Sequence, residues 1–218
     1  MTGCPGIPLA AVDFYTELEL NNHRAWWAAN KGRYDTDVLE PMLALGAALA
    51  DEFGAAKLFR PQRDVRFSSD KSPYKTHQGL VVHTGEAMGY YVQISGDGLM
   101  TAAGWYAPFP ALVAAYRAAV DDEDAGAALE RIAADLSAAG AALGGDLLKT
   151  RPKGFDADHP RIDLLRHKTV TAGFQYGLPD WLDSPALVDR VRADWRRFTP
   201  LMEWLTTWVD GGRAVRDG

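Results

Sequence analysis

The chain has 218 residues, of which 47% are hydrophobic and 24% are charged, and its net charge is −6 with a pI near 5.3. This length suffices for one substantial hydrophobic core, so we expect a single domain over residues 1–218. The acidic balance argues against a general nucleic-acid coat protein, because such proteins neutralise many phosphates with a broad basic surface.

The start of the sequence has the features of a short tail. It lacks a basic stretch followed by an apolar one, and no apolar run approaches the roughly 18 residues of a membrane span. We therefore expect a cytoplasmic protein with no membrane partner, in which residues 1–11 form a flexible tail. The single cysteine, Cys4, lies in that tail and excludes an internal disulfide.

Residues 11–53 have a helical pattern that is interrupted near residue 21. Asn22 is predicted to cap the second helix, which carries Trp26 and Trp27, because its side-chain oxygen can accept an unpaired backbone N–H of the first turn. Pro41 predicts that a third helix starts or kinks near Glu40, since proline disrupts a helix interior.

Residues 57–106 change to the alternating pattern of strands. A short strand is expected near Lys57–Pro61, followed by strands over 78–84, 89–95 and 98–106. Gly96-Asp97 suits a tight turn between the last two, because a positive φ costs glycine little. The pattern predicts antiparallel hairpins.

The helical period returns after residue 106. Pro110 is predicted to lie in the first turn of one helix, and the acidic run 121–124 to complement the dipole at the start of the next. A long final helix is expected from Ser184-Pro185, with its tryptophans in the core: Trp195, Trp204 and Trp208. Strands grouped together between helices indicate an α+β fold, an antiparallel sheet packed by N-terminal, central and C-terminal helices.

Positive charge is segregated into two runs. Residues 60–77 hold five Lys/Arg against two Asp, and residues 149–168 hold six against three, so each run carries +3. The rest of the chain must then carry −12. Such asymmetry predicts an anionic partner for the basic runs, a phosphate- or carboxylate-bearing small molecule or a nucleic-acid end.

The first run also has the residue types of an anion site. If residues 63–67 are extended, Asp64 and Arg66 share a face, so the carboxylate can orient the guanidinium toward a ligand. A turn at Ser72-Pro73 would bring Lys71 and Lys75 together, and Tyr74 could supply a stacking face. In the structural alternative, Asp64 and Asp70 neutralise the arginines in ion pairs and the two lysines are solvated.

Two separated motifs carry a family resemblance. They consist of Asn21, Asn22 and Trp26, followed by Arg63, Asp64, Arg66, Phe67, Asp70, Lys71, Ser72, Pro73, Tyr74 and Lys75. In this order they resemble the signature of the family known as domain of unknown function 2461, over about residues 12–208. Trp27 stands where such relatives are expected to have phenylalanine. The resemblance implies no reaction, but it implies that the two basic runs belong to one site or one surface.

The predicted site is therefore drawn from both runs. Its ligand-binding candidates are Arg63, Arg66, Lys71, Tyr74, Lys75, Lys153, Arg166 and Lys168, and its candidates for moving a proton are Asp64 and His167. Whether the protein is an enzyme stays open. The alternative function is a protein-interaction module in which the same surface docks an acidic partner.

Other chemistries are disfavoured. The spacing of Asp156, Asp158, His159 and Asp163 matches no metal-ligand pattern, so no metal is predicted. A nucleophile among Ser68, Ser69 and Ser72 would need contact with His77, and no nucleophile-elbow motif is present. The chain also lacks the glycine-rich phosphate loops of dinucleotide and NTP folds, and no cofactor is predicted.

Overall fold

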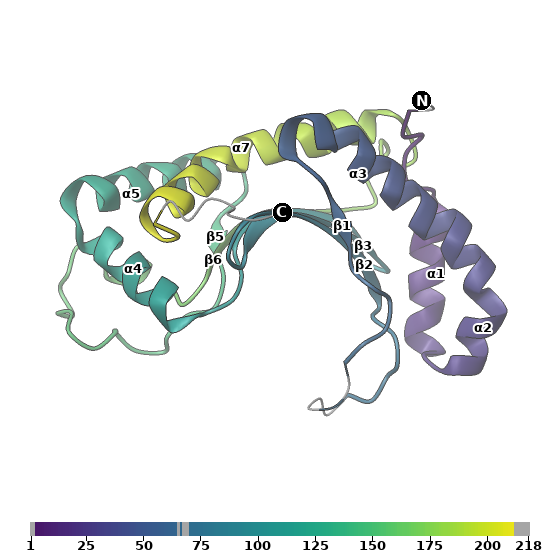
Figure 1. The fold of residues 1–218 in the computed structure, drawn as a ribbon, viewed down its shortest axis with the longest axis horizontal. Helices are drawn as coiled ribbons and strands as arrows, with labels where there is room; N and C mark the ends of the chain where they lie inside the picture. Colours follow the sequence, from purple (N-terminus) through teal and green to yellow (C-terminus); the bar gives the residue numbers. More distant parts are fainter. Residues whose placement is uncertain (1–2, 65, 67–69, 212–218) are drawn as a thin grey trace. The chain divides into compact units, whose positions relative to one another are not determined.

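The computed structural model describes residues 3–64, 66 and 70–211 and has an α+β fold (Figure 1). Its six strands form one antiparallel sheet in the order β1-β2-β3-β4-β6-β5. The helices are α1 (Leu9–Leu20), α2 (Arg24–Arg33), η1 (Tyr34–Leu39, a π-helix), α3 (Glu40–Phe53), α4 (Pro110–Asp121), α5 (Glu123–Ala138), α6 (Ile162–Leu165) and α7 (Ala186–Trp208). The strands are β1 (Lys57–Leu58), β2 (His77–Gly85), β3 (Met88–Ser95), β4 (Gly98–Trp105), β5 (Leu143–Gly144) and β6 (Val170–Gly177).

The two asparagines between α1 and α2 do not cap α2. Asn21 ends α1 and donates from Nδ2 to the carbonyl of Glu17 at 2.9 Å. The N-cap of α2 is His23, whose Nδ1 accepts from the backbone N–H of Trp26 at 3.3 Å. The prediction that Asn22 is the cap is therefore wrong, and its side chain is available for a different contact.

Pro41 marks the start of α3, as expected. It occupies the first turn of that helix, where its missing N–H costs no intrahelical bond. The preceding residues form η1, and the N–H of Glu40 bonds the carbonyl of Asp35, five residues back. This wider turn joins α2 to α3 without a loop.

The predicted hairpin strands are confirmed by β2, β3 and β4, and the turn at Gly96-Asp97 joins β3 to β4. β1 is shorter than expected. The strands β5 and β6 were missed, although residues 170–176 alternate between the two faces in the manner of a strand. The first turns of α4 and α5 follow the prediction: Pro110 begins α4, and Asp122 caps α5 by accepting from the N–H groups of residues 124 and 125.

The chain forms two compact units, which are described separately. Unit 1 contains residues 3–82, 91–101 and 175–193, and unit 2 contains residues 83–90, 102–174 and 194–211. The two basic runs fall into different units, residues 60–77 into unit 1 and residues 149–168 into unit 2.

In unit 1 the helical segments pack on one face of the strands. Leu80 of β2 contacts the helix α3 at Gly46, where an added Cβ would lie 2.8 Å from the leucine. On the same face, Gln78 is buried and accepts from the hydroxyl of Tyr34 at 2.7 Å, while its Nε2 donates to the carbonyl of Phe59 at 2.8 Å. This network ties η1, the end of β1 and the start of β2 together.

Two expectations about burial are corrected. Residues 3–11 are not a free tail, because Cys4 is 6% exposed, Ile7 is fully buried with its N–H bonded to the carbonyl of Leu182, and α1 already begins at Leu9. Trp208 is not in the core, because 44% of it is exposed. Trp195 and Trp204 are buried, as predicted.

None of the helices in the described part of the chain is long and apolar enough to cross a lipid bilayer.

Candidate functional site

The first basic run forms a loop between β1 and β2 whose two ends are held together by the backbone. Gln62 and Tyr74 form an antiparallel bridge. On either side of it, the N–H of Arg63 donates to the carbonyl of Pro73 at 2.9 Å, and the N–H of Lys75 donates to the carbonyl of Pro61 at 2.8 Å. The ends of the loop are therefore fixed. Residues 65 and 67–69 lie outside the described part of the chain, and they include the candidate nucleophiles Ser68 and Ser69. The prediction that residues 63–67 are extended is therefore not tested.

Both aspartates of the loop pair with arginines. Asp64 accepts from Arg66 Nε at 3.0 Å and from Nη2 at 2.6 Å, so it holds the guanidinium as predicted. Hydrogen bonds from Arg66 lower the pKa of Asp64. Asp70 pairs with Arg63 and also accepts from the N–H of Ser72 at 2.9 Å; its bonds to Ser72 and the charge of Arg63 lower its pKa. The ion pairs of the structural alternative are thus present.

The side chain of Asn22 clamps the end of the loop that leads into β2. Asn22 Nδ2 donates to the carbonyl of Tyr74 at 2.9 Å, and Asn22 Oδ1 accepts from the N–H of the same residue at 3.1 Å. The amide thereby pairs with the Tyr74 backbone as a neighbouring strand would. The ring of Tyr74 stacks on Trp27, with centroids 4.1 Å apart and planes at 10°. Tyr74 therefore anchors the loop to α2.

Positive charges converge where the loop joins β2. Lys75 is half-buried, and burial together with the charges of Arg60 and Arg63 lowers its pKa. His77, the first residue of β2, has its pKa lowered by burial and by the charges of Lys75 and Arg63. Within the described residues, no carboxylate lies within ion-pair distance of Lys75 Nζ. We call Arg60, Arg63, Lys75 and His77 the cationic cluster.

Two aromatic rings lie beside the cationic cluster. Lys75 Nζ is 5.0 Å from the ring centroid of Phe59, which is 6.2 Å from the ring centroid of Tyr91. The Tyr91 ring occupies the space above Gly79, because a Cβ added there would lie 2.7 Å from Tyr91 Cε2. Sequence reasoning missed Phe59, Arg60, Tyr91 and the clamp. The two rings depend on which residues β1 and β3 bring next to β2, and the clamp depends on a contact between residues 52 positions apart.

A comparison with known protein families identifies the family of this chain. The sequence model of the family described as Conserved hypothetical protein (DUF2461) matches residues 10–204. The chain belongs to this family. No curated protein and no solved structure matches the chain.

Two of the three candidates of the second run of this DUF2461 protein, Arg166 and Lys168, are occupied by contacts within unit 2. The guanidinium of Arg166 donates to the carbonyl of Leu148 from Nε and Nη2, both at 3.1 Å, and Lys168 lies 3.7 Å from Asp146. Lys153 is exposed and lines an open hollow formed by residues 150–154. Of these three cations, Lys153 alone has no partner among the described residues.

The two candidates for proton transfer have different surroundings. His167 is buried, and its Nδ1 lies 3.1 Å from the carbonyl oxygen of Thr169; burial lowers the pKa of the imidazole. Asp64 is exposed and ion-paired. Neither belongs to the cationic cluster, and their catalytic roles stay predictions. The described residues contain no group of three or more His, Cys, Asp or Glu that could hold a metal ion.

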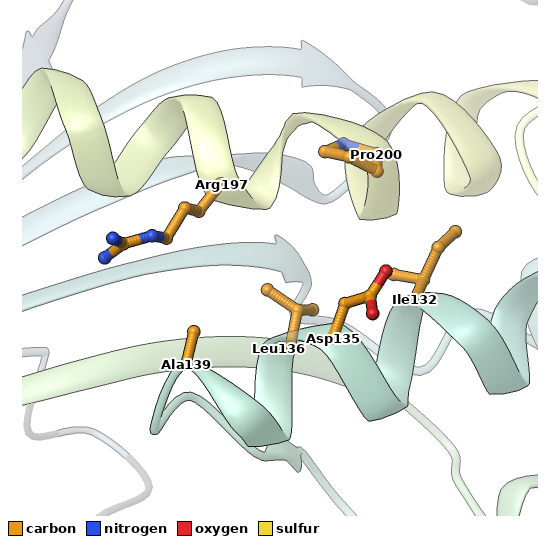
Figure 2. Close-up of a pocket in the computed structure, with 6 residues that line it drawn as sticks. All are labelled: Ile132, Asp135, Leu136, Ala139, Arg197 and Pro200. Carbon is orange, nitrogen blue, oxygen red and sulfur yellow. The ribbon is translucent and has the colours of Figure 1, made fainter.

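A small hollow of about 170 Å³ lies in unit 2 between α5 and α7 (Figure 2). Ile132, Leu136, Ala139 and Pro200 give it an apolar lining. Asp135 on α5 and Arg197 on α7 lie at its rim, and the guanidinium extends along α7 away from Pro200. None of the predicted site residues lines this hollow, so the candidate site remains the cationic cluster of unit 1.

Proposed function

We propose that the cationic cluster binds an anionic small molecule or a nucleic-acid end that carries a phosphate or a carboxylate. The observation that supports this most is the environment of Lys75. Its amine is partly withdrawn from water and lies near Arg60 and Arg63, and it has no carboxylate partner among the described residues. Gathering like charges in this way is unfavourable in the free protein. A bound anion would remove the repulsion.

The loop around the cluster is suited to hold the cations in place. Asp70 fixes Arg63, and the backbone pairs at the loop ends fix Lys75. The guanidinium of Arg63 has five donor hydrogens, of which the pair with Asp70 uses only some. Arg63 can therefore be oriented by Asp70 and still donate to a ligand, which is the arrangement that recognises phosphates and carboxylates.

A thermal-shift screen with two matched variants tests the proposal. Lys75→Met removes one charge of the cluster but keeps an apolar side chain on Phe59, whereas Lys31→Met removes an exposed charge of α2 that pairs with Asp35. A ligand present at 100 times its Kd adds about 2.7 kcal/mol, which raises the Tm of a chain of this size by roughly 5–10 °C. The ligands are phosphate, sulfate, acetate, sugar phosphates, mononucleotides, short oligonucleotides and an acidic peptide.

We expect one class of anion to stabilise the wild type and the Lys31→Met variant but not Lys75→Met. If no anion shifts the wild type, or if the two variants respond alike, the cluster is not an anion site. Stabilisation by an acidic peptide alone, with no response to the small anions, would favour the alternative of a docking module for an acidic protein segment.

A further inference from the structure

Another hollow of unit 2 has a polar lining, supplied by the hairpin of β2 and β3 and by the C-terminal part of α7. Its volume is about 360 Å³, near the lower end of the range of small-molecule pockets. We infer that this hollow binds a small hydroxylated amine, an amino alcohol or an amino sugar, with the ammonium group at Glu203 and the hydroxyl groups at the threonines around it. The inference is independent of the cationic cluster, which belongs to unit 1.

One side of the hollow is a stripe of polar residues on α7. Thr199, Glu203 and Thr206 follow one another at intervals of four and three residues, so they lie on the same face of the helix. Thr207 extends the stripe, because it follows Glu203 by four residues. Met202 also lines the hollow and is buried. The helix therefore presents three hydroxyls, one carboxylate and one apolar side chain to the hollow.

The hairpin of β2 and β3 supplies the other side. Tyr90 is buried, and its hydroxyl lies 3.0 Å from Thr199 Oγ1, so the hairpin and the helix are joined at the inner side of the hollow. Thr84 is half-buried, and its Oγ1 is buried without a hydrogen-bond partner among the described residues. Buried polar atoms are nearly always paired. Rotation about Cα–Cβ exchanges the hydroxyl and methyl positions of a threonine, so Thr84 can turn its hydroxyl toward a ligand that offers a partner.

The polar groups of the stripe are available to a ligand. Among the described residues, Glu203 has no ion-pair partner, and the hydroxyls of Thr206 and Thr207 make no hydrogen bond. Glu203 and Thr207 are exposed and Thr206 is half-buried. A ligand can therefore bond these three side chains by replacing water, without breaking a bond within the protein.

The chemistry of the lining selects the class of ligand. A carboxylate only accepts hydrogen bonds, and a bond that it accepts from an ammonium group is charge-assisted. Five of the seven lining residues carry a hydroxyl, which both donates and accepts and so matches the hydroxyls of a ligand. The charge of Glu203 disfavours an anion, and Met202 is the single apolar side chain of the lining. A hydroxylated amine supplies both the positive charge and the hydroxyls that this lining fits.

The test is a titration of the isotope-labelled full chain with glucosamine, glucose and cyclohexylamine, followed by two-dimensional amide NMR at a slightly acidic pH. Glucose lacks the positive charge, and cyclohexylamine lacks the hydroxyls. We expect glucosamine to bind at least about threefold more tightly than either, because an exposed ion pair contributes up to about fivefold in affinity and each neutral hydrogen bond about twofold or more. The amide shifts should be centred on residues 84–90 and 199–207.

Three variants assign the two preferences to the lining. Glu203→Gln keeps the shape of the side chain but removes its charge, so glucosamine and glucose should then bind alike. The double variant Thr206→Val/Thr207→Val removes two hydroxyls and should abolish the preference over cyclohexylamine. Glu123→Gln removes the charge of an exposed glutamate of unit 2 that lies outside the hollow, and it should leave both preferences intact.

The inference is overturned if glucosamine shifts none of the amides of the lining, or if glucose or cyclohexylamine binds the wild type as tightly. It is also overturned if Glu203→Gln and Glu123→Gln weaken glucosamine binding equally, because the effect would then come from the net charge of the protein. A preference over cyclohexylamine that survives in the double valine variant would show that the hydroxyls of the stripe do not hold the ligand, with the same consequence.

Discussion

The substitution Asn22→Ala should loosen the basic loop from α2. It removes two hydrogen bonds at once, from Asn22 Nδ2 to the Tyr74 carbonyl and from the Tyr74 N–H to Asn22 Oδ1. Each such bond contributes about 0.5–1.5 kcal/mol to stability, so we expect a loss of roughly 1–3 kcal/mol in the free energy of unfolding. Asn22→Asp keeps the acceptor for the Tyr74 N–H but sets a carboxylate oxygen against the Tyr74 carbonyl, so it should not restore the lost stability.

Asn21→Ala is the matched control for this loss. It truncates the same residue type one position earlier, but among the described residues it removes a single side-chain bond, an exposed one to the carbonyl of Glu17. Its expected cost is about 0.5 kcal/mol or less. Urea denaturation followed by tryptophan fluorescence measures both variants, and an unchanged slope with a lower midpoint in Asn22→Ala would show a change in stability.

Amide hydrogen exchange locates the effect. The N–H groups of Arg63, Tyr74 and Lys75 are bonded only while the loop base is closed, so their exchange in Asn22→Ala should accelerate by about tenfold for each 1.4 kcal/mol of local stability that is lost. Equal losses for Asn21→Ala and Asn22→Ala, with unchanged exchange at Tyr74, would refute the role of the clamp. Anion binding by Asn22→Ala should weaken in parallel.

Three further substitutions can be measured by urea denaturation, two beside the site in unit 1 and one at His167 in unit 2. Tyr34→Phe leaves the buried Gln78 Oε1 without its donor and should cost about 1–3 kcal/mol. Gly79→Ala places a methyl group in the space of the Tyr91 phenol group, so we expect a loss of about 1–3 kcal/mol in the free energy of unfolding from overpacking. His167 has a lowered pKa in the folded chain, so the unfolded chain binds more protons below the ordinary pKa of about 6.5. Stability should therefore fall as the pH drops below about 6.5. His167→Gln should make this fall shallower without removing it, because the pKa of His77 is lowered as well.

Much of the fold could be predicted because its signals are local. Pro41 and Pro110 mark helix starts through their missing N–H groups, and Gly96-Asp97 marks a turn through the φ that glycine tolerates. By contrast, β6 was missed although its residues alternate. The pattern of a single strand is short, and what secures β6 is its place beside β4 and β5, which no local signal shows.

The role of Asn22 shows why the site could be predicted only in part. A polar residue before a helix is a good cap in isolation, and His23 takes that position because the Asn22 amide finds two partners 52 residues away. The sequence identified the run that contains the candidate site, and it identified the Asp64–Arg66 pair because these residues are two apart. Phe59 and Tyr91 could not be found in this way, since only strand pairing brings them to Lys75.

The structure also shows which charges of the first basic run are neutralised by ion pairs. The sequence counts +3 over residues 60–77, without saying which cations the two aspartates neutralise. In the structure, Asp64 holds Arg66 and Asp70 holds Arg63. Arg60 and Lys75 are left without an ion pair among the described residues, and Lys75 is the more buried of the two. Of the three cations that Asp64 and Asp70 do not neutralise, Arg60 and Lys75 thus lie at the end of the loop next to the sheet, whereas Lys71 lies within the loop. Because Lys75 is the more buried of these two, its removal should affect anion binding most.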